Sequence, residues 1–205
     1  MKIYSDGYRV YLGSLAHEHA TALSEIGNDA EIAHDIAAPG EFPSPYKEEN
    51  AIEFIKYAND TLDEGVEYHF GIFLKADSTL IGVVGFMHVD RLNKKAELGY
   101  WIGKRYQGHG YATEALGIIL HFGFLNLGLE RVYAQTFSFN EGSKRLLEHI
   151  GFTLEGRLRK NTLLDEGFID DYVYGLLKGE FDATDRFNEG SKAVKACKAK
   201  DGRRI

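Results

Sequence analysis

The segment from Ala96 to Phe152 constrains the fold most, because a strand, a glycine-rich loop and a long apolar helix follow one another within it. The strand has the letters AELGYWIG, the loop has KRYQGHG, and the helix is expected over residues 111–126. That helix is apolar on nearly all sides, so it should be buried. A helix start exposes unpaired backbone N–H groups and the positive end of the helix dipole. Small residues let an anion approach that backbone closely, so the loop predicts a phosphate-binding site.

Hydrophobic periodicity predicts further elements on both sides of this segment. Strands are expected over residues 8–12, 95–103, 131–137, 152–160 and 168–177, and a hairpin is expected over residues 68–75 and 79–89, turning at Asp77 and Ser78. Helices are expected over residues 16–33, 48–64 and 141–150. We therefore predict one mixed α/β domain (α+β, with a central sheet flanked by helices) over residues 1–181.

The last 24 residues differ in composition from the rest of the chain. They hold seven basic and four acidic side chains, whereas the whole chain of 205 residues has a formal charge of −7. Residues 182–205 are therefore expected to form a basic, loose tail. The negative charge of the whole argues against nucleic acid as a partner, because phosphate backbones require a basic surface.

Cysteine, histidine and hydropathy patterns exclude several classes of protein. A single cysteine, Cys197, cannot form a disulfide framework within the chain. The N-terminal residues lack the apolar core of a signal peptide, and no run of about 18 apolar residues is present. The histidines show no H-E-x-x-H spacing or other ligand set, so no metal is expected. We expect a cytoplasmic protein without a membrane partner.

The loop and its flanks resemble the GNAT family of N-acetyltransferases. The family signature is Gln/Arg-x-x-Gly-x-Gly/Ala, and residues 107–112 have the letters QGHGYA. The flanking letters AELGYWIG, TEAL and NEGSKRLLEHIGFTLEGRLR extend the resemblance over roughly residues 7–180. They are similar to the branch with ribosomal-protein N-terminal and spermidine acetyltransferases. A dinucleotide fingerprint is a poorer match, because Thr113 stands where its third glycine belongs, and a plain helix-capping turn is the remaining alternative.

This resemblance implies acetyl-CoA as the acyl donor, a GNAT-like central sheet, and roles for three segments. The loop would bind the pyrophosphate through backbone N–H groups, and residues 98–102 would pair with the pantetheine arm as a strand does. Asn140 would contact the cofactor, and Ser143 would protonate the leaving thiolate; for both residues a helix N-cap is the alternative. The implied cofactor-binding residues are Tyr100, Trp101, Ile102, Gln107, Gly108, His109, Gly110, Tyr111, Ala112, Thr113, Asn140 and Ser143.

Acetyl transfer also needs a group that removes a proton from the amine. Glu97 is our candidate for this catalytic base, directly or through a water, because it lies on the strand that leads into the cofactor loop. A solvated or salt-bridged glutamate is the alternative. Some members of the branch place an acidic base after the GF-x-x-E-G stretch. The corresponding letters here, RKNTLLDEG, offer no evident inward acid.

The identity of the acceptor is constrained only by amine chemistry. An α-amino group with a pKa near 7.7–8.0 is roughly a tenth neutral at pH 7, whereas a lysine-like amine is under about a thousandth neutral. This favours a protein or peptide N-terminus as the acceptor. Two alternatives stay open, a small-molecule amine (polyamine, aminosugar or antibiotic) as the acceptor and a non-catalytic acyl-CoA-binding module. A homodimer also stays open. Phe42 and Tyr46 could frame the acceptor and Glu41, Glu48 and Glu49 could attract a cation, although an ordinary acidic connector is the simpler interpretation.

Overall fold

The computed structural model describes residues 1–4, 6–29, 32, 42–165, 167–182 and 195–197. Its described strands form one sheet in the order β7-β8-β6-β5-β4-β3-β2-β1-β9, in which β5 and β6 are parallel and the other neighbours antiparallel. The strands are β1 (Lys2–Tyr4), β2 (Val10–Gly13), β3 (Tyr68–Leu74), β4 (Leu80–Asp90), β5 (Lys95–Ile102), β6 (Arg131–Phe137), β7 (Thr153–Leu164), β8 (Gly167–Leu177) and β9 (Lys195–Cys197). The helices are α1 (Ala20–Gly27), α3 (Glu48–Glu64), α4 (Tyr111–His121), α5 (Glu141–Ile150) and α6 (Lys178–Asp182). The mixed α/β architecture predicted from the sequence is confirmed.

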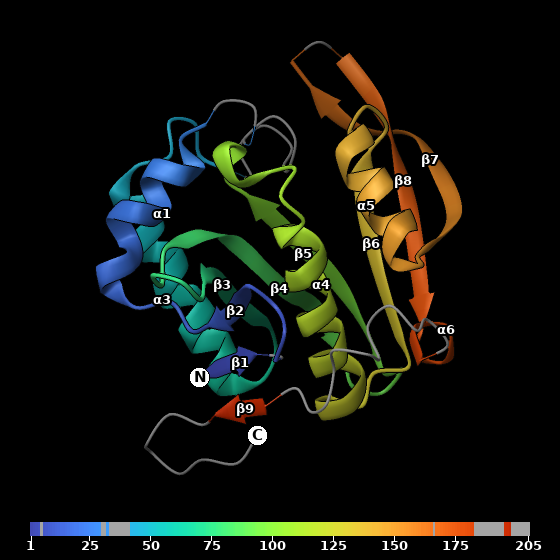
Figure 1. Ribbon diagram of the computed structural model, residues 1–205. Coiled ribbons are helices and arrows are strands. Elements are labelled where there is room, and N and C mark those ends of the chain that lie inside the picture. Colours follow the sequence, from blue (N-terminus) through green and yellow to red (C-terminus); the bar gives the residue numbers. More distant parts are fainter. Residues whose placement is uncertain (5, 30–31, 33–41, 166, 183–194, 198–205) are drawn as a thin grey trace.

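Two apolar clusters cover the two faces of the sheet. Side chains alternate between the faces along a strand, so Leu98 and Ile102 of β5 pack into the larger cluster while Trp101 packs against the smaller one. The larger cluster holds the buried side chains of α4 and α5, and the smaller one holds those of α1 and α3. In Figure 1, α4 and α5 lie in front of the sheet, whereas α1 and α3 lie on the left. Each strand of the centre is therefore buried on both sides.

The sheet opens between β5 and β6. Their pairing covers three register positions and ends at Glu97↔Tyr133, beyond which β5 stays paired with β4 and β6 with β8. The N–H of Gly103 donates to the carbonyl of Ile81 on the β4 side at 2.9 Å. Because backbone groups alternate in direction along an antiparallel strand, those of Leu98, Tyr100 and Ile102 face the opening. The carbonyl of Ile102 accepts a hydrogen bond from Gln107 Nε2 at 3.2 Å, and a ligand with amide groups can pair with the remaining groups of this strand edge.

The helix that follows the glycine loop is as long as expected. Helix α4 continues into a π-helical turn (Phe122–Asn126), so together they span residues 111–126. From Ala115 to His121 every side chain of α4 is buried. The prediction of a buried helix at this place is confirmed.

The ends of the chain differ from expectation. The strand expected over residues 8–12 is β2, which begins at Val10. The strand β1 before it was not predicted, because three residues are too few to show a period. The first helix is also shorter: a 3₁₀ turn (His17–His19) precedes α1, and residues 30–31 and 33 lie outside the described residues. In the tail, β9 pairs with β1. Residues 183–194 and 198–205 lie outside the described part of the chain.

Candidate active site

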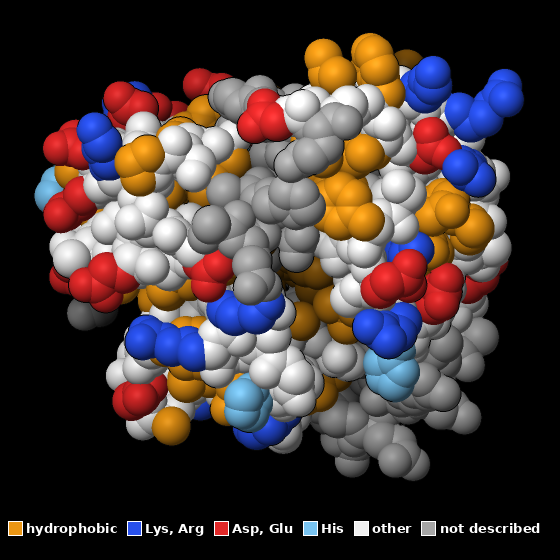
Figure 2. All heavy atoms as spheres, turned by 90° about the horizontal axis from the view of Figure 1, so that it is seen from above, with side chains coloured by type: hydrophobic (Ala, Val, Ile, Leu, Met, Phe, Trp, Pro, Cys, Tyr) orange, Lys and Arg blue, Asp and Glu red, His pale blue; other side chains and the backbone are white. Residues whose placement is uncertain are grey.

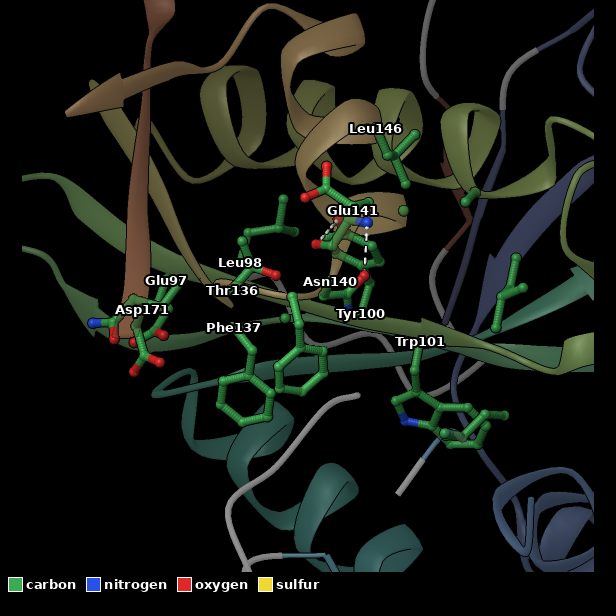
Figure 3. A pocket seen from close by; sticks show the side chains of 18 of the residues that line it. Glu97, Leu98, Tyr100, Trp101, Thr136, Phe137, Asn140, Glu141, Leu146 and Asp171 are labelled. Atoms are coloured by element: carbon green, nitrogen blue, oxygen red, sulfur yellow. Dashed lines mark hydrogen bonds between the residues drawn. The ribbon is translucent and has the colours of Figure 1, made fainter. Parts of the chain in front are cut away.

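A cavity of about 990 Å³ lies where β5 and β6 separate. Side chains and backbone from β5, β6, the start of α5 and the β7–β8 hairpin line it. Figure 2 shows apolar side chains inside the hollow between the two halves of the molecule, and Figure 3 shows the polar groups that point into it. The predicted site residues that line the cavity are Glu97, Tyr100, Trp101, Ile102, Gln107, Ala112, Asn140 and Ser143. The others, Gly108, His109, Gly110, Tyr111 and Thr113, belong to the loop and to the first turn of α4.

The loop before α4 requires glycine at two positions. Gly108 has φ +74° and Gly110 has φ +80°, a left-handed conformation that costs other L-residues about 1–2 kcal/mol. A Cβ atom on Gly108 would have no heavy atom within 4 Å, so this side of the loop is open. The next residues, Tyr111, Ala112 and Thr113, start the helix and have N–H groups without an intrahelical acceptor. The geometry therefore suits the anion-binding role expected for the loop.

Arg9, which the sequence did not single out, braces this loop. Its Nε donates to Glu114 Oε1 at 2.7 Å, and its backbone N–H donates to Glu114 Oε2 at 2.6 Å. Its Nη2 donates to the carbonyl of His109 at 2.7 Å, and its guanidinium lies 4.7 Å from the centre of the Tyr111 ring. The guanidinium thus fixes the loop, while its charge is balanced by the Glu114 carboxylate in the first turn of α4. Arg9 and Glu114 are 105 residues apart, so no local pattern could reveal the pair.

A hydroxyl pair lies on the α4–α5 side of the opening. The hydroxyls of Tyr100 and Ser143 are 2.8 Å apart, and the Oδ1 of Asn140 accepts the backbone N–H of Ser143 at 2.9 Å (Figure 3). Asn140 is thus the N-cap of α5 and lines the cavity at the same time. Burial, opposed by the hydrogen bond to Ser143, raises the pKa of Tyr100 to about 12. The phenol therefore stays protonated at neutral pH and can donate to Ser143 Oγ, which leaves the serine proton free for a bound group.

Glu97 lies on the opposite face of β5. Its side chain is 17% exposed, and its Oε2 lies 2.9 Å from Nδ1 of His88, whose side chain is 71% exposed. Burial and the Glu97 carboxylate raise the pKa of Tyr133, the residue paired with Glu97 on β6. Glu97 thus combines features of both interpretations made from the sequence. It lines the cavity, and its carboxylate is also paired with His88.

The β7–β8 hairpin supplies an inward acid that the sequence interpretation missed. Asp171 on β8 is 4% exposed and lines the cavity, and its Oδ2 accepts hydrogen bonds from Asn161 Nδ2 and Thr162 Oγ1, both at 2.7 Å. The RKNTLLDEG stretch thus supplies the two donors, and the facing strand supplies the acid. The signal was the pair Asp170–Asp171: successive strand residues point to opposite faces, so one of the two had to point inward.

The connector between the first two helices does not frame an acceptor in the way expected. Tyr46 is 5% exposed and packs in the smaller apolar cluster, and its ring stacks on Phe42 with centroids 4.6 Å apart. Burial raises the pKa of the Tyr46 phenol to about 12. Glu48 accepts a hydrogen bond from Thr21 at the surface, and Glu41 lies outside the described residues. The Tyr46 ring fills space between packed helices, which agrees with the simpler interpretation of this segment as an ordinary connector.

The described ranges hold neither a cluster of metal-ligating side chains nor a helix that could span a membrane. In residues 1–4, 6–29, 32, 42–165, 167–182 and 195–197, no three or more His, Cys, Asp and Glu side chains gather as metal ligands would. In the same ranges, no helix combines the length and the hydropathy needed to cross a membrane.

Comparisons with known proteins place this geometry in a family. Residues 9–153 match the family described as acetyltransferase (GNAT) domain. A Bacillus licheniformis protein with the name Uncharacterized N-acetyltransferase p20 is 32% identical over 174 residues, which cover 84% of this chain and 95% of that relative. The ribosomal-protein-serine acetyltransferase of Escherichia coli (strain K12) is 33% identical over 98 residues, 48% of this chain and 55% of that relative. The solved structure of RimL, a ribosomal alpha-N-protein acetyltransferase in complex with coenzyme A, superposes with a TM-score of 0.76 at 21% identity, over 85% of this chain and 97% of that one. With its open sheet and its glycine loop, this chain belongs to the GNAT family of N-acetyltransferases.

Proposed function

We propose that this enzyme transfers the acetyl group of acetyl-CoA to the N-terminal α-amino group of a protein or peptide. The observation that supports this most is the cavity between β5 and β6, which has a free strand edge, a hydroxyl pair on one face of the sheet and carboxylates on the other. Transfer from a thioester to an amine needs a proton donor at the sulfur and a proton acceptor at the nitrogen. The two faces of the opening supply one of each.

The described residues fit the donor substrate. Its pyrophosphate would meet the N–H groups at the start of α4, beside the loop that Arg9 holds in place. Its pantetheine amides would pair with the backbone of Leu98, Tyr100 and Ile102, which faces the opening. The bound donor supplies an activated acyl thioester. These contacts use main-chain groups, so they tolerate many side chains.

The residues of the chain divide the proton transfers between the two faces. Ser143 donates a proton to the leaving sulfur, and the phenol of Tyr100 holds and replenishes that serine hydroxyl at 2.8 Å. Glu97 accepts the proton that the attacking amine loses, directly or through a water. The carboxylate and the hydroxyls belong to opposite faces of β5. The amine can therefore lose its proton and the thiolate can gain one at the same time, without competing for a single group.

The choice of an α-amino acceptor rests on chemistry and on one relative. The neutral fraction of an α-amino group at pH 7 is about a hundredfold larger than that of a lysine-like amine, so it asks less of the base. Glu97 already interacts with His88 and Tyr133, so an acceptor that depends less on a base suits this site better. The name of the Escherichia coli relative indicates a ribosomal protein as its acceptor.

A turnover assay with a panel of amines tests this function. We expect kcat/KM at least about tenfold higher for peptides with a free N-terminus than for the same peptides with a blocked N-terminus and an internal lysine, for the pKa reason above. Polyamines and aminosugars complete the panel. Turnover of those small amines alone would make the chain a small-molecule acetyltransferase. Binding of coenzyme A without turnover of any amine would make it a non-catalytic module.

The pH dependence of Glu97→Gln tests the base. A protonated carboxyl cannot accept a proton, so the fall of wild-type kcat/KM toward acid pH should be steeper than protonation of the amine alone would make it. Glutamine does not titrate, so the variant should keep only the amine-dependent limb. The substitution should lower kcat/KM more for a lysine-like acceptor than for an α-amino acceptor, because the lysine-like amine depends more on the base. The measurement is a pH–rate profile with one acceptor of each kind, and identical profiles for both enzymes would assign the base to another group.

A further inference from the structure

One buried carboxylate oxygen in the wall of the cavity has no role in the reaction described so far. Asp171 is the only buried carboxylate among the residues that the structure describes. Its Oδ2 accepts two hydrogen bonds, whereas its Oδ1 is buried and has no hydrogen-bond partner among the described residues. A buried polar atom without a partner costs free energy, and such atoms in native proteins need an explanation.

The strand register places Asp171 on the same face of the sheet as Glu97. Glu97 pairs with Tyr133 on β6, and Asp171 pairs with Phe137 on the same strand. Tyr133 and Phe137 are four residues apart, so their side chains and those of their partners share a face. In Figure 3 the two carboxylates appear at the same end of the view, on the side of the strands away from Leu146 of α5. Both acids thus face the part of the cavity that the amine would enter.

Asp171 is held in a fixed orientation. Asn161 and Thr162 of β7 both donate to Oδ2, so the carboxylate cannot rotate without breaking one of these bonds. The adjacent Asp170 points to the other face, where its Oδ2 accepts from Arg157 Nε and its Oδ1 accepts from the backbone N–H of Lys160. A carboxylate with one satisfied and one free oxygen is an acceptor for an N–H or O–H group of a ligand.

We propose that Asp171 binds the acceptor substrate, with Oδ1 accepting an N–H group of the incoming primary amine. A primary amine carries the donors that the free oxygen lacks, and its positive charge in solution matches a cavity face with two carboxylates. Asp171 is thus a specificity-determining residue that selects amines over uncharged nucleophiles, whereas Glu97 accepts the proton. This assignment rests on the proposed acetyl transfer and names the residue that recognises its acceptor.

The test is Asp171→Asn, which keeps the shape and can still accept from Asn161 and Thr162. Its amide would present a donor where Oδ1 is, so the acceptor KM should rise about tenfold or more, the loss expected for one hydrogen bond to a charged group. The KM for acetyl-CoA and kcat should change less than about twofold, because the donor and the proton acceptor are untouched. The melting temperature should not fall, because the variant removes a buried charge with an unpaired oxygen.

Asp170→Asn is the matched control, one residue along on the opposite face. It should lower the melting temperature through loss of the Arg157 contact and leave the acceptor KM unchanged. A second variant, Thr162→Val, frees Asp171 from one of its two donors and should raise the acceptor KM about threefold or more. It decides the question if Asp171→Asn does not fold.

Equilibrium binding separates this proposal from the proposed function. Calorimetry of a primary amine, either a peptide with a free N-terminus or spermidine, added to the enzyme saturated with coenzyme A requires no turnover. Weaker binding to Asp171→Asn by about tenfold supports the assignment, even if peptides prove not to be the acceptors. An unchanged Kd and acceptor KM, or a fall in kcat alone, overturns it.

Discussion

Gly110→Glu is expected to abolish measurable binding of coenzyme A, a loss of about a hundredfold or more in affinity. Gly110 precedes α4 with φ +80°, and a Cβ atom there would lie 3.2 Å from Arg9 Nη2. The new side chain would crowd the guanidinium that braces the loop. Its negative charge would also stand at the helix start, where the pyrophosphate is expected, and would repel it. Calorimetry with coenzyme A and the purified variant measures the loss.

A matched control separates the phosphate site from a general fold defect. Gly128 also has a positive φ, +69°, and a Cβ atom there would have nothing within 4 Å. Gly128→Glu therefore introduces the same charge and a similar backbone strain at a residue that does not line the cavity. It should bind coenzyme A with wild-type affinity. If Gly110→Glu melts like this control and still binds coenzyme A normally, the loop does not hold the pyrophosphate.

Local patterns predicted the elements that carry the site. The expected helix over residues 141–150 has the same bounds as α5, and the strand 131–137 has those of β6. Both depend on side-chain periods within one segment, which a sequence displays directly. The opening between β5 and β6 depends instead on which strands pair and where the pairing ends, and no single segment encodes this.

The residues missed at the site share that cause. Arg9 meets Glu114 across 105 positions, and Asp171 becomes a cavity residue only through the register of β8 on β6. For Tyr46 the sequence left two interpretations open, a residue that frames the acceptor and a residue of an ordinary connector. The Tyr46 ring packs over Gly27 of α1, where an added Cβ atom would lie 3.0 Å from Tyr46 Cδ1. The close approach of α1 to the connector therefore buries the ring of Tyr46. Contacts distant in sequence decide all three cases.

Ser143→Ala is expected to lower kcat by about a hundredfold, the lower end of general acid–base effects, with little change in the affinity for coenzyme A. The structure separates this role from helix capping. The cap of α5 is a hydrogen bond from the backbone N–H of Ser143 to Asn140 Oδ1, and alanine keeps that N–H. The melting temperature should therefore stay close to that of the wild type, while single-turnover rates with acetyl-CoA and an amine acceptor fall.

Two neighbours of Ser143 complete this test. Tyr100→Phe removes the phenol that lies 2.8 Å from Ser143 Oγ and should lower kcat less than Ser143→Ala does, because the serine can still donate its own proton. Asn140→Ala removes the cap and should cost about 1 kcal/mol of the free energy of unfolding. Near-normal turnover in Ser143→Ala, or a loss of melting temperature equal to that of Asn140→Ala, would reduce Ser143 to a structural residue. A kcat that falls while stability holds would instead assign the thiolate's proton to this hydroxyl, because Asn140 alone carries the cap.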